Sequence, residues 1–274
     1  IVAECLGALV VLAPAAALPP AQALLEARNT GGDDGWKARW TLATALKFAM
    51  GPRTPVAAVR AAMPAFLPLL SDANLAAKRA ALLMLNSALH HQAGVVAERV
   101  PGTVMPALLA VFDIFIERVV DLGPFKHKVD DGLPLRKVAL SCVYTGLDRV
   151  PERLDLPALM PKLAQACADK AEDMCLLAHQ VVARVCAVQP AAVLGAADAV
   201  LGPLETVLNK KQKQAQAGHE VERRNELLRS ALRTLLAISA IDEGGEIRRL
   251  EDILEKASKK EHLAEMMAAE SAQK

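Results

Sequence analysis

The amino-acid sequence predicts an all-α array of repeated helical hairpins with one inserted β-hairpin, from its composition, its hydrophobic periodicity and a repeat length near 40 residues. Hydrophobic residues make up 53% of the 274 residues, yet aromatic residues make up only 3%. The apolar residues are mainly Ala and Leu, which are strong helix formers, whereas strands favour aromatic and β-branched residues. The composition therefore predicts helices around an aliphatic core.

The clearest helical pattern runs from residue 133 to residue 150. Its apolar residues recur at the 3.6-residue period that marks one face of a helix. They are Leu135, Val138, Ala139, Cys142, Val143, Leu147 and Val150. Asp131 is the expected N-cap, and Pro134 suits the first turn.

A repeat emerges when residues early in the long predicted helices are compared. Arg39 and Arg79 are 40 positions apart, and Arg136 and Cys175 are 39 apart. The intervals from Arg79 to Arg136 and from Cys175 to Arg229 are longer, which indicates an insertion in each. A two-helix unit of about 40 residues is typical of HEAT and armadillo arrays, whose repeats bury their apolar faces by stacking. We therefore predict a HEAT/armadillo-like α-α superhelical solenoid.

We expect a single HEAT-repeat array over residues 1–274. The chain has no initiator Met and starts abruptly inside an apolar pattern, so a fragment of a longer solenoid is expected. Residues 244–274 carry an apolar stripe opposite many charges, which predicts C-terminal capping helices. The remaining insertion, residues 209–222, is polar and predicts an exposed loop or a frayed helix end.

The first 25 residues allow more than one interpretation, because residues 5–25 contain no charged side chain. A run of this length resembles a membrane span or a signal peptide. Against both, Glu4 stands where a signal peptide carries basic residues, and Pro14, Pro19 and Pro20 would break a spanning helix. We predict two short buried helices separated by a Pro-containing turn, and no membrane contact.

The insertion at residues 113–131 predicts a β-hairpin. Gly123-Pro124 is a turn signal, and after it Phe125, His127 and Val129 alternate at period two with the charged residues Lys126, Lys128 and Asp130. Before the turn, Val120 and Leu122 share a face with Arg118. An isolated two-stranded hairpin is marginal in water, so a protruding one favours a partner; the alternative is a hairpin folded back on its own repeat. The candidate partner-binding residues are Val119, Val120, Leu122, Gly123, Pro124, Phe125, Lys126, His127, Lys128 and Val129.

Motifs for catalysis are absent from the sequence. It contains no phosphate loop, Gly-x-Ser-x-Gly, His-Glu-x-x-His or calcium-loop spacing. The 32 Lys and Arg against 31 Asp and Glu give a net charge of +1, without the basic excess of nucleic-acid binding. The five cysteines lack a Cys-x-x-Cys pair, which argues against zinc and a disulfide framework. We predict a non-enzyme without cofactor, metal, nucleic-acid or small-molecule site; the alternative is a thiol enzyme.

A resemblance to a known family rests on the segment LGPFKHKVDDGL, residues 122–133, followed by Arg136-Lys137 and Cys142-Val143-Tyr144. This segment resembles the C-terminal region of the cullin-associated, neddylation-dissociated (CAND) proteins, also called TATA-binding-protein-interacting proteins. Shorter matches in the same order lie at residues 2–7, 45–48, 86–88 and 192–194. Lys128 and Pro134 depart from the family pattern.

The resemblance implies a non-catalytic regulator of cullin–RING ubiquitin ligases. The HEAT solenoid would wrap an unneddylated cullin with its RING-box subunit, and its C-terminal end would hold the cullin's N-terminal region. The hairpin, Ile116 to Val129, would occupy the docking site of the adaptor and substrate receptor. Receptor exchange and SCF complex assembly, in cytoplasm and nucleus, would follow. The alternative is a generic HEAT scaffold or a nuclear transport receptor-like protein.

Overall fold

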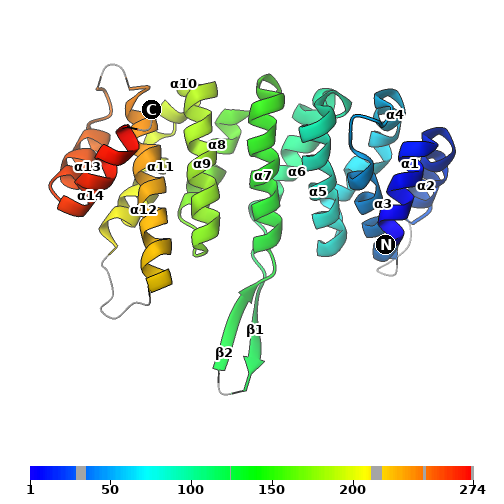
Figure 1. Ribbon diagram of the computed structural model, residues 1–274, viewed down its shortest axis with the longest axis horizontal. Coiled ribbons are helices and arrows are strands. Elements are labelled where there is room, and N and C mark those ends of the chain that lie inside the picture. The colour runs from blue at the N-terminus through cyan, green and yellow to red at the C-terminus, as the bar shows by residue number, and fades with distance from the viewer. Residues whose placement is uncertain (29–34, 124, 211–217, 243–244, 273–274) are drawn as a thin grey trace. The chain divides into compact units, whose positions relative to one another are not determined.

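The computed structural model describes residues 1–28, 35–123, 125–210, 218–242 and 245–272. Its helices form two compact units, Ile1–Leu154 and Asp155–Lys274. Each unit stacks helices in two layers, as expected for a HEAT/armadillo-like all-α fold with one inserted hairpin (Figure 1). The expectation of one array over residues 1–274 stays a prediction.

In the first unit, four helices form one layer in which successive members pack side by side (Figure 1). They are α1 (Val2–Leu12), α3 (Trp36–Ala49), α5 (Leu75–Gln92) and α7 (Leu133–Arg149). The second layer consists of shorter helices and single helical turns. They are α2 (Pro14–Arg28), α4 (Val56–Phe66), η2 (Leu67–Ser71), η3 (Ala93–Val95), η4 (Ala97–Arg99), η5 (Val100–Val104) and α6 (Met105–Val111). A further turn, η6 (Pro151–Arg153), follows α7.

Small residues let the helices of the first unit approach closely. Ala43, Ala81 and Ala139 are completely buried. Gly7 of α1 lies so near α3 that an added Cβ atom would be 2.7 Å from the carbonyl oxygen of Ala45. The Ala-rich composition thus produces a core in which backbones, as well as side chains, are in contact.

The N-terminal segment forms two helices, but the boundary and the burial differ from the prediction. The break falls at Ala13, and Pro14 opens α2, where its missing N–H costs no helical hydrogen bond. Pro19 and Pro20 lie inside α2 and do not form the turn. The expectation that both helices are buried is wrong, because Leu12 of α1 is 80% exposed and α2 buries only Leu18 and Leu25. Helix α1 buries one face only.

In the second unit, α9 (Glu172–Val188), α12 (Gly218–Ser239) and α14 (Glu261–Ser271) form one layer. The other layer holds α8 (Leu156–Cys167), α10 (Pro190–Leu194), α11 (Ala197–Asn209) and α13 (Arg248–Ser258). Residues 211–217 of the predicted polar loop lie outside the described residues. Helix α12 begins at Gly218, so residues 218–222 are helical. Helices α13 and α14 lie where capping helices were expected, and their capping role stays a prediction.

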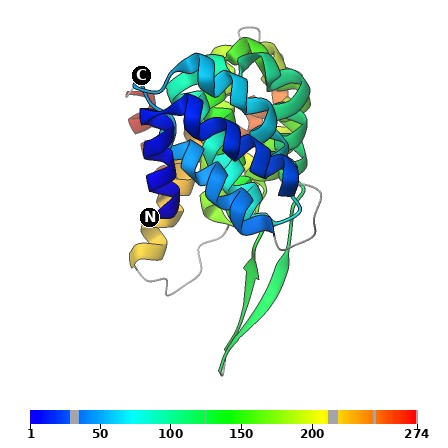
Figure 2. The same ribbon diagram turned by 90° about the vertical axis from the view of Figure 1, so that its right-hand side faces the viewer.

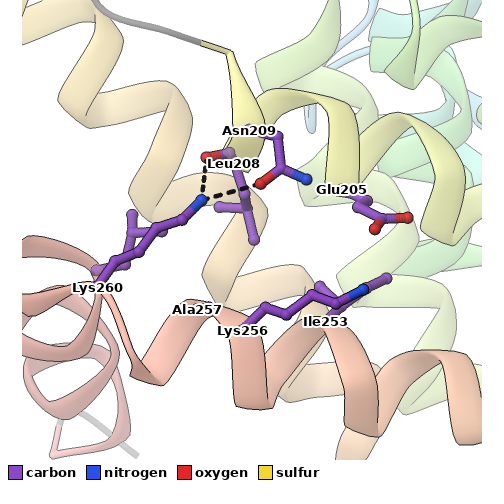
Figure 3. A pocket seen from close by; sticks show the side chains of 8 residues that line it. Glu205, Leu208, Asn209, Ile253, Lys256, Ala257 and Lys260 are labelled. Carbon is purple, nitrogen blue, oxygen red and sulfur yellow. Dashed lines mark hydrogen bonds between the residues drawn. The ribbon is translucent and has the colours of Figure 1, made fainter.

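The C-terminal end of α11 is held by a side chain from the start of α14 (Figure 3). Lys260 donates a hydrogen bond from Nζ to Oδ1 of Asn209 at 2.9 Å and one to the carbonyl oxygen of Leu208 at 3.5 Å. A cation is favoured at this end of a helix because the last carbonyl groups lack helical partners. The small hollow in Figure 3 is therefore a packing contact between α11 and the last two helices.

Helices α7 and α9 match in detail, although they belong to different units. Both contain 17 residues, and each buried residue of α7 has a buried counterpart 39 positions later in α9. The 39-residue interval read from the sequence is therefore a true structural repeat.

Among the described residues no single helix is long and apolar enough to cross a membrane. One pair of helical segments bent by 110°, Leu75–Val95 with Ala97–Val111, is long and apolar enough only when the two are taken together, by length and composition alone.

Candidate functional site

The predicted hairpin is present, between α6 and α7. Strand β1 (Glu117–Leu122) pairs antiparallel with β2 (Phe125–Asp130), and Leu122 is the partner of Phe125. Two residues are left for the loop. Gly123, the first of them, has a φ of 77°, which glycine adopts without steric cost and which two-residue hairpin loops require. The turn signal at Gly123-Pro124 therefore has a direct backbone cause.

The hairpin extends away from the helices of its own unit, beyond the N-terminal end of α7 (Figures 1 and 2). The alternative of a hairpin folded back on its own repeat is contradicted. Val119 is 61% exposed, and Lys126, His127 and Lys128 are exposed as well. A large apolar side chain held this far into water is a natural contact point for another molecule.

The strand register gives the hairpin two different faces. Arg118 and Val120 of β1 lie opposite Val129 and His127 of β2, so these four residues share one face. Val120 and Val129 are half-buried there. The sequence pattern predicted this shared face on each strand, and the register joins the two halves.

The opposite face carries charges of both signs around an apolar centre. Asp121 lies opposite Lys126, and Val119 lies opposite Lys128. Opposite charges across a strand pair stabilise the pairing, while like charges would oppose it. Charged residues along an open edge also discourage uncontrolled strand pairing. This face therefore presents one exposed apolar side chain, Val119, surrounded by charged side chains.

Three of the predicted site residues have side chains that lie outside the described part of the structure. Pro124 lies outside the described residues, and so do the side chains of Leu122 and Phe125. Phe115, which precedes the predicted site, was missed: its side chain is 51% exposed, and the neighbouring Ile116 is 40% exposed. The signal was present in the sequence, since both belong to the apolar run that enters the first strand. Exposed apolar surface therefore continues to the base of the hairpin.

A buried arginine joins the base of the hairpin to α7. Arg136 is 2% exposed, and its Nη1 atom lies 2.8 Å from Oδ2 of Asp130 and 2.8 Å from the carbonyl oxygen of Ile114. Its guanidinium carbon lies 4.0 Å from the centroid of the Phe115 ring, a cation–π distance. One side chain thus contacts the residues before β1 and the last residue of β2.

Asp130 is the second centre of this base. Its Oδ1 atom accepts hydrogen bonds from the backbone N–H groups of Ile116 at 3.1 Å and Gly132 at 2.9 Å. Burial raises the pKa of the Asp130 carboxyl, but the N–H of Ile116 and the Arg136 guanidinium more than offset it and lower that pKa below 3.8. The ionised carboxylate therefore adds stability above its ordinary pKa, and this is lost as the pH falls through the lower folded-state value.

The predicted N-cap, Asp131, has a different role. The N-cap of α7 is Gly132, which makes no side-chain cap. The carboxylate of Asp131 pairs instead with Nε of Arg118 at 2.6 Å, and the preceding Asp130 accepts the N–H of Gly132. A Cβ atom on Gly132 would lie 2.2 Å from the carbonyl oxygen of Ile114. The position leaves no space for a side chain.

Groups suited to catalysis are not gathered in the described part of the chain. No cluster of three or more His, Cys, Asp or Glu that could hold a metal occurs there. All five cysteines are free, and only Cys5 is exposed. Burial raises the pKa of the Cys142 and Cys167 thiols and raises that of Cys175 to about 11, which disfavours the reactive thiolate.

Comparison with known proteins gives a consistent family. A family model described as "TATA-binding protein interacting (TIP20)" matches residues 96–266. Cullin-associated NEDD8-dissociated protein 1 of Dictyostelium discoideum is 33% identical over 93% of this chain and 20% of its own length. The corresponding protein 2 of Rattus norvegicus is 32% identical over 91% of this chain and 19% of its own length.

A relative from Emericella nidulans is named as the C-terminal part of cullin-associated NEDD8-dissociated protein 1. It is 31% identical over 86% of this chain and 22% of its own length. The chain thus spans about a fifth of the length of these relatives.

Solved structures with similar folds include two designed armadillo repeat proteins. One has a TM-score of 0.54 at 14% identity, over 91% of this chain and 97% of its own. The other, solved with a peptide, has a TM-score of 0.55 at 12% identity, over 93% and 98%. These likenesses establish the armadillo-type fold alone.

Proposed function

The chain belongs to the TATA-binding protein interacting (TIP20) family, and from this membership we propose that it regulates cullin–RING ubiquitin ligases without catalytic chemistry of its own. The relatives it matches are named as cullin-associated proteins. The observation that carries the proposal is the free hairpin, Ile116 to Val129, which projects from a helical stack with exposed apolar side chains at its base and along β1. Such a surface suits a partner that is also a folded protein.

The partner in this proposal is the N-terminal region of an unneddylated cullin with its RING-box subunit, in cytoplasm and nucleus. The hairpin occupies the place where the cullin holds its adaptor and substrate receptor. The two ligands then weaken each other's binding by the same factor, because coupling between two sites on one protein is reciprocal. A short-lived ternary complex would let one receptor leave and another enter, which is receptor exchange and supports SCF complex assembly.

The contact is expected to depend on a few hairpin residues. Interfaces commonly take most of their binding energy from a small number of well-packed side chains. Val119 is the most exposed apolar residue described in the strands, and Phe115 and Ile116 extend the apolar surface to the base. Lys126 and Lys128 flank Val119 on the same face and supply charge at its rim.

The test replaces residues 116–129 of the 274-residue chain by a Gly/Ser linker of equal length. Size-exclusion chromatography measures co-elution with a cullin N-terminal domain, with and without adaptor. We expect the linker variant to keep its helical circular dichroism and to lose competition with the adaptor. If competition persisted at the wild-type level, the hairpin role would be wrong. If the wild-type chain bound a small GTPase and no cullin, the transport-receptor alternative would replace the proposal.

A matched pair of point variants sharpens this test. Val119→Asp places a charge on the exposed hairpin valine, while Val56→Asp makes the same change on α4, where Val56 is 45% exposed. We expect Val119→Asp to weaken competition about tenfold or more, as for an interface anchor. Val56→Asp should compete like the wild type, because it lies on a helix that the proposal does not involve.

A further inference from the structure

We propose that Arg136 is a positioning residue that fixes the direction in which the hairpin projects from α7. The inference concerns the hairpin's orientation in the free protein, and its consequence for binding rests on the proposed function. A hairpin of two strands has little stability of its own, so its direction depends on its attachment. Arg136 belongs to α7, which packs against α5 in the first unit, and its side chain reaches the residues that lead into and out of the hairpin.

The contacts of Arg136 fix both ends of the hairpin at once. On the entering side it donates to the carbonyl oxygen of Ile114 at 2.8 Å and stacks 4.0 Å from the Phe115 ring. On the leaving side it pairs with Asp130 at 2.8 Å. The guanidinium is planar and offers several donors in a fixed geometry, so contacts in different directions restrict its rotation. A lysine could not make this set of contacts.

The backbone around this arginine is also fixed. Oδ1 of Asp130 bridges the N–H groups of Ile116 and Gly132, which belong to the two ends of the insertion. Gly132 lies against the carbonyl group of Ile114 with no space for a side chain. Further out, Arg118 of β1 pairs with Asp131 at 2.6 Å. Pivoting the hairpin would break several of these interactions together.

The matched helix α9 shows that a repeat needs no arginine at this position for its own packing. Cys175 is the counterpart of Arg136, and its Sγ atom donates to the carbonyl oxygen of Asp169 in the short turn before α9. The same turn also contains a hydrogen bond from the N–H of Ala171 to Oδ1 of Asp169, so the short side chain of Cys175 adds one contact to a turn that is already closed. The longer side chain of Arg136 contacts structure that α9 lacks, namely both ends of a hairpin. Its extra contacts therefore concern the hairpin.

A hairpin with a fixed direction benefits binding because less freedom is lost when the complex forms. Rigid, preorganised elements associate more favourably than mobile ones with the same contacts. In this view Arg136 contributes to affinity without touching the partner. Its loss should lower affinity only where a hairpin is present to be positioned.

The first experiment measures hairpin direction without any partner. Spin labels are placed on the 274-residue chain through Lys126→Cys in β2 and Arg79→Cys in α5, both exposed, in a Cys5→Ala background, because the other cysteines are buried. Double electron–electron resonance should give one narrow distance distribution. Arg136→Met should broaden it at least twofold, and Arg149→Met, at an exposed position near the end of the same helix, should leave it unchanged. Equal widths in all three would overturn the proposal.

The second experiment separates positioning from general stability. Arg136→Met should weaken binding of a cullin N-terminal domain by about tenfold, and should have no further effect in the chain whose residues 116–129 are replaced by a linker. An equal loss in both backgrounds would show a structural role and refute positioning. If Arg136→Met does not fold, Asp130→Asn removes the ion pair while keeping an acceptor for both N–H groups, and it should broaden the distances in the same direction. If Arg136→Met broadens the distance distribution but the wild-type chain binds no cullin, the positioning role is supported and the proposed function is rejected.

Discussion

Helices α7 and α9 have equal lengths and the same buried positions, yet different segments lead into them. Residues 168–171 form a short turn before α9, whereas residues 112–132 contain the whole hairpin before α7. The repeat therefore keeps the helix register and varies the connection. Insertions of this kind place function on loops while stacked helices supply the stability.

The comparison extends to single positions at the start of each helix. The N-cap is Gly132 in α7 and Ala171 in α9, and four residues later stand Arg136 and Cys175. Arg136 and Cys175 each donate a hydrogen bond to a carbonyl group in the segment that precedes their own helix. The same position thus anchors the preceding connection in both repeats, with a side chain whose length matches the size of that connection.

The largest expected effect comes from a position where the two helices differ in chemistry. His179 of α9 is the counterpart of Leu140 in α7; it is completely buried, and its Nδ1 lies 3.3 Å from the hydroxyl of Ser230. Burial lowers the pKa of His179 from 6.5 to about 4. Between these values the unfolded chain binds a proton that the folded one does not, so stability falls as the pH decreases from 6.5 to 4.

We therefore predict that His179→Leu removes this acid sensitivity. Below pH 4 the variant should gain about 3 kcal/mol in unfolding free energy relative to the wild type, and near pH 7 the two should differ by about 1 kcal/mol or less. Urea denaturation across this pH range measures it. The matched control is His219→Leu, an exposed position on α12. Parallel pH profiles for wild type and His179→Leu would contradict the interpretation.

The next effect concerns the N-cap. Gly132 has a φ of −78°, which any residue adopts, so its need for glycine is steric. A Cβ atom would meet the backbone of Ile114 at 2.2 Å. We expect Gly132→Ala to destabilise the first unit by about 2 kcal/mol, as overpacking usually does.

The opposite exchange in α9 is the control for this prediction. Ala171→Gly should change stability by about 0.5 kcal/mol or less, because glycine is accepted at an N-cap but adds freedom to the unfolded chain. Chemical denaturation of both variants gives the comparison. If Gly132→Ala proved as mild as Ala171→Gly, the close contact at the base of the hairpin would not constrain α7.

The features predicted correctly from the sequence are those encoded by local periodicity. The 39-residue interval marks two helices with identical burial, and the alternation on either side of Gly123 marks the two strands. The faces of the hairpin follow from the same alternation. Within each helix and strand the pattern needs only residues that are close together in the chain, and the 39-residue interval aligns two such local patterns, so composition and spacing were enough.

The features that were missed depend on contacts between distant residues. The position of Asp131 in the sequence predicted an N-cap, but its carboxylate accepts a hydrogen bond from Arg118, 13 residues away. The arginines used to align the repeats also differ in role. Arg136 is buried, and Arg39 pairs with Asp72 at 2.5 Å, whereas Arg79 is exposed on α5. A shared residue type at a repeated position did not indicate a shared contact.

The smallest expected effect tests how α9 anchors its short turn. Cys175→Ala removes the hydrogen bond from Sγ to Asp169, 3.1 Å long, together with a buried sulfur atom. We expect a loss of about 1 kcal/mol, the usual net value for one hydrogen bond, whereas Cys5→Ala on the exposed side of α1 should change stability by about 0.5 kcal/mol or less. Thermal and urea denaturation of the two variants measure the difference. If Cys175→Ala lowered the free energy of unfolding no more than Cys5→Ala does, the turn before α9 would need no anchor. Anchoring by this position would then be specific to Arg136 and the hairpin.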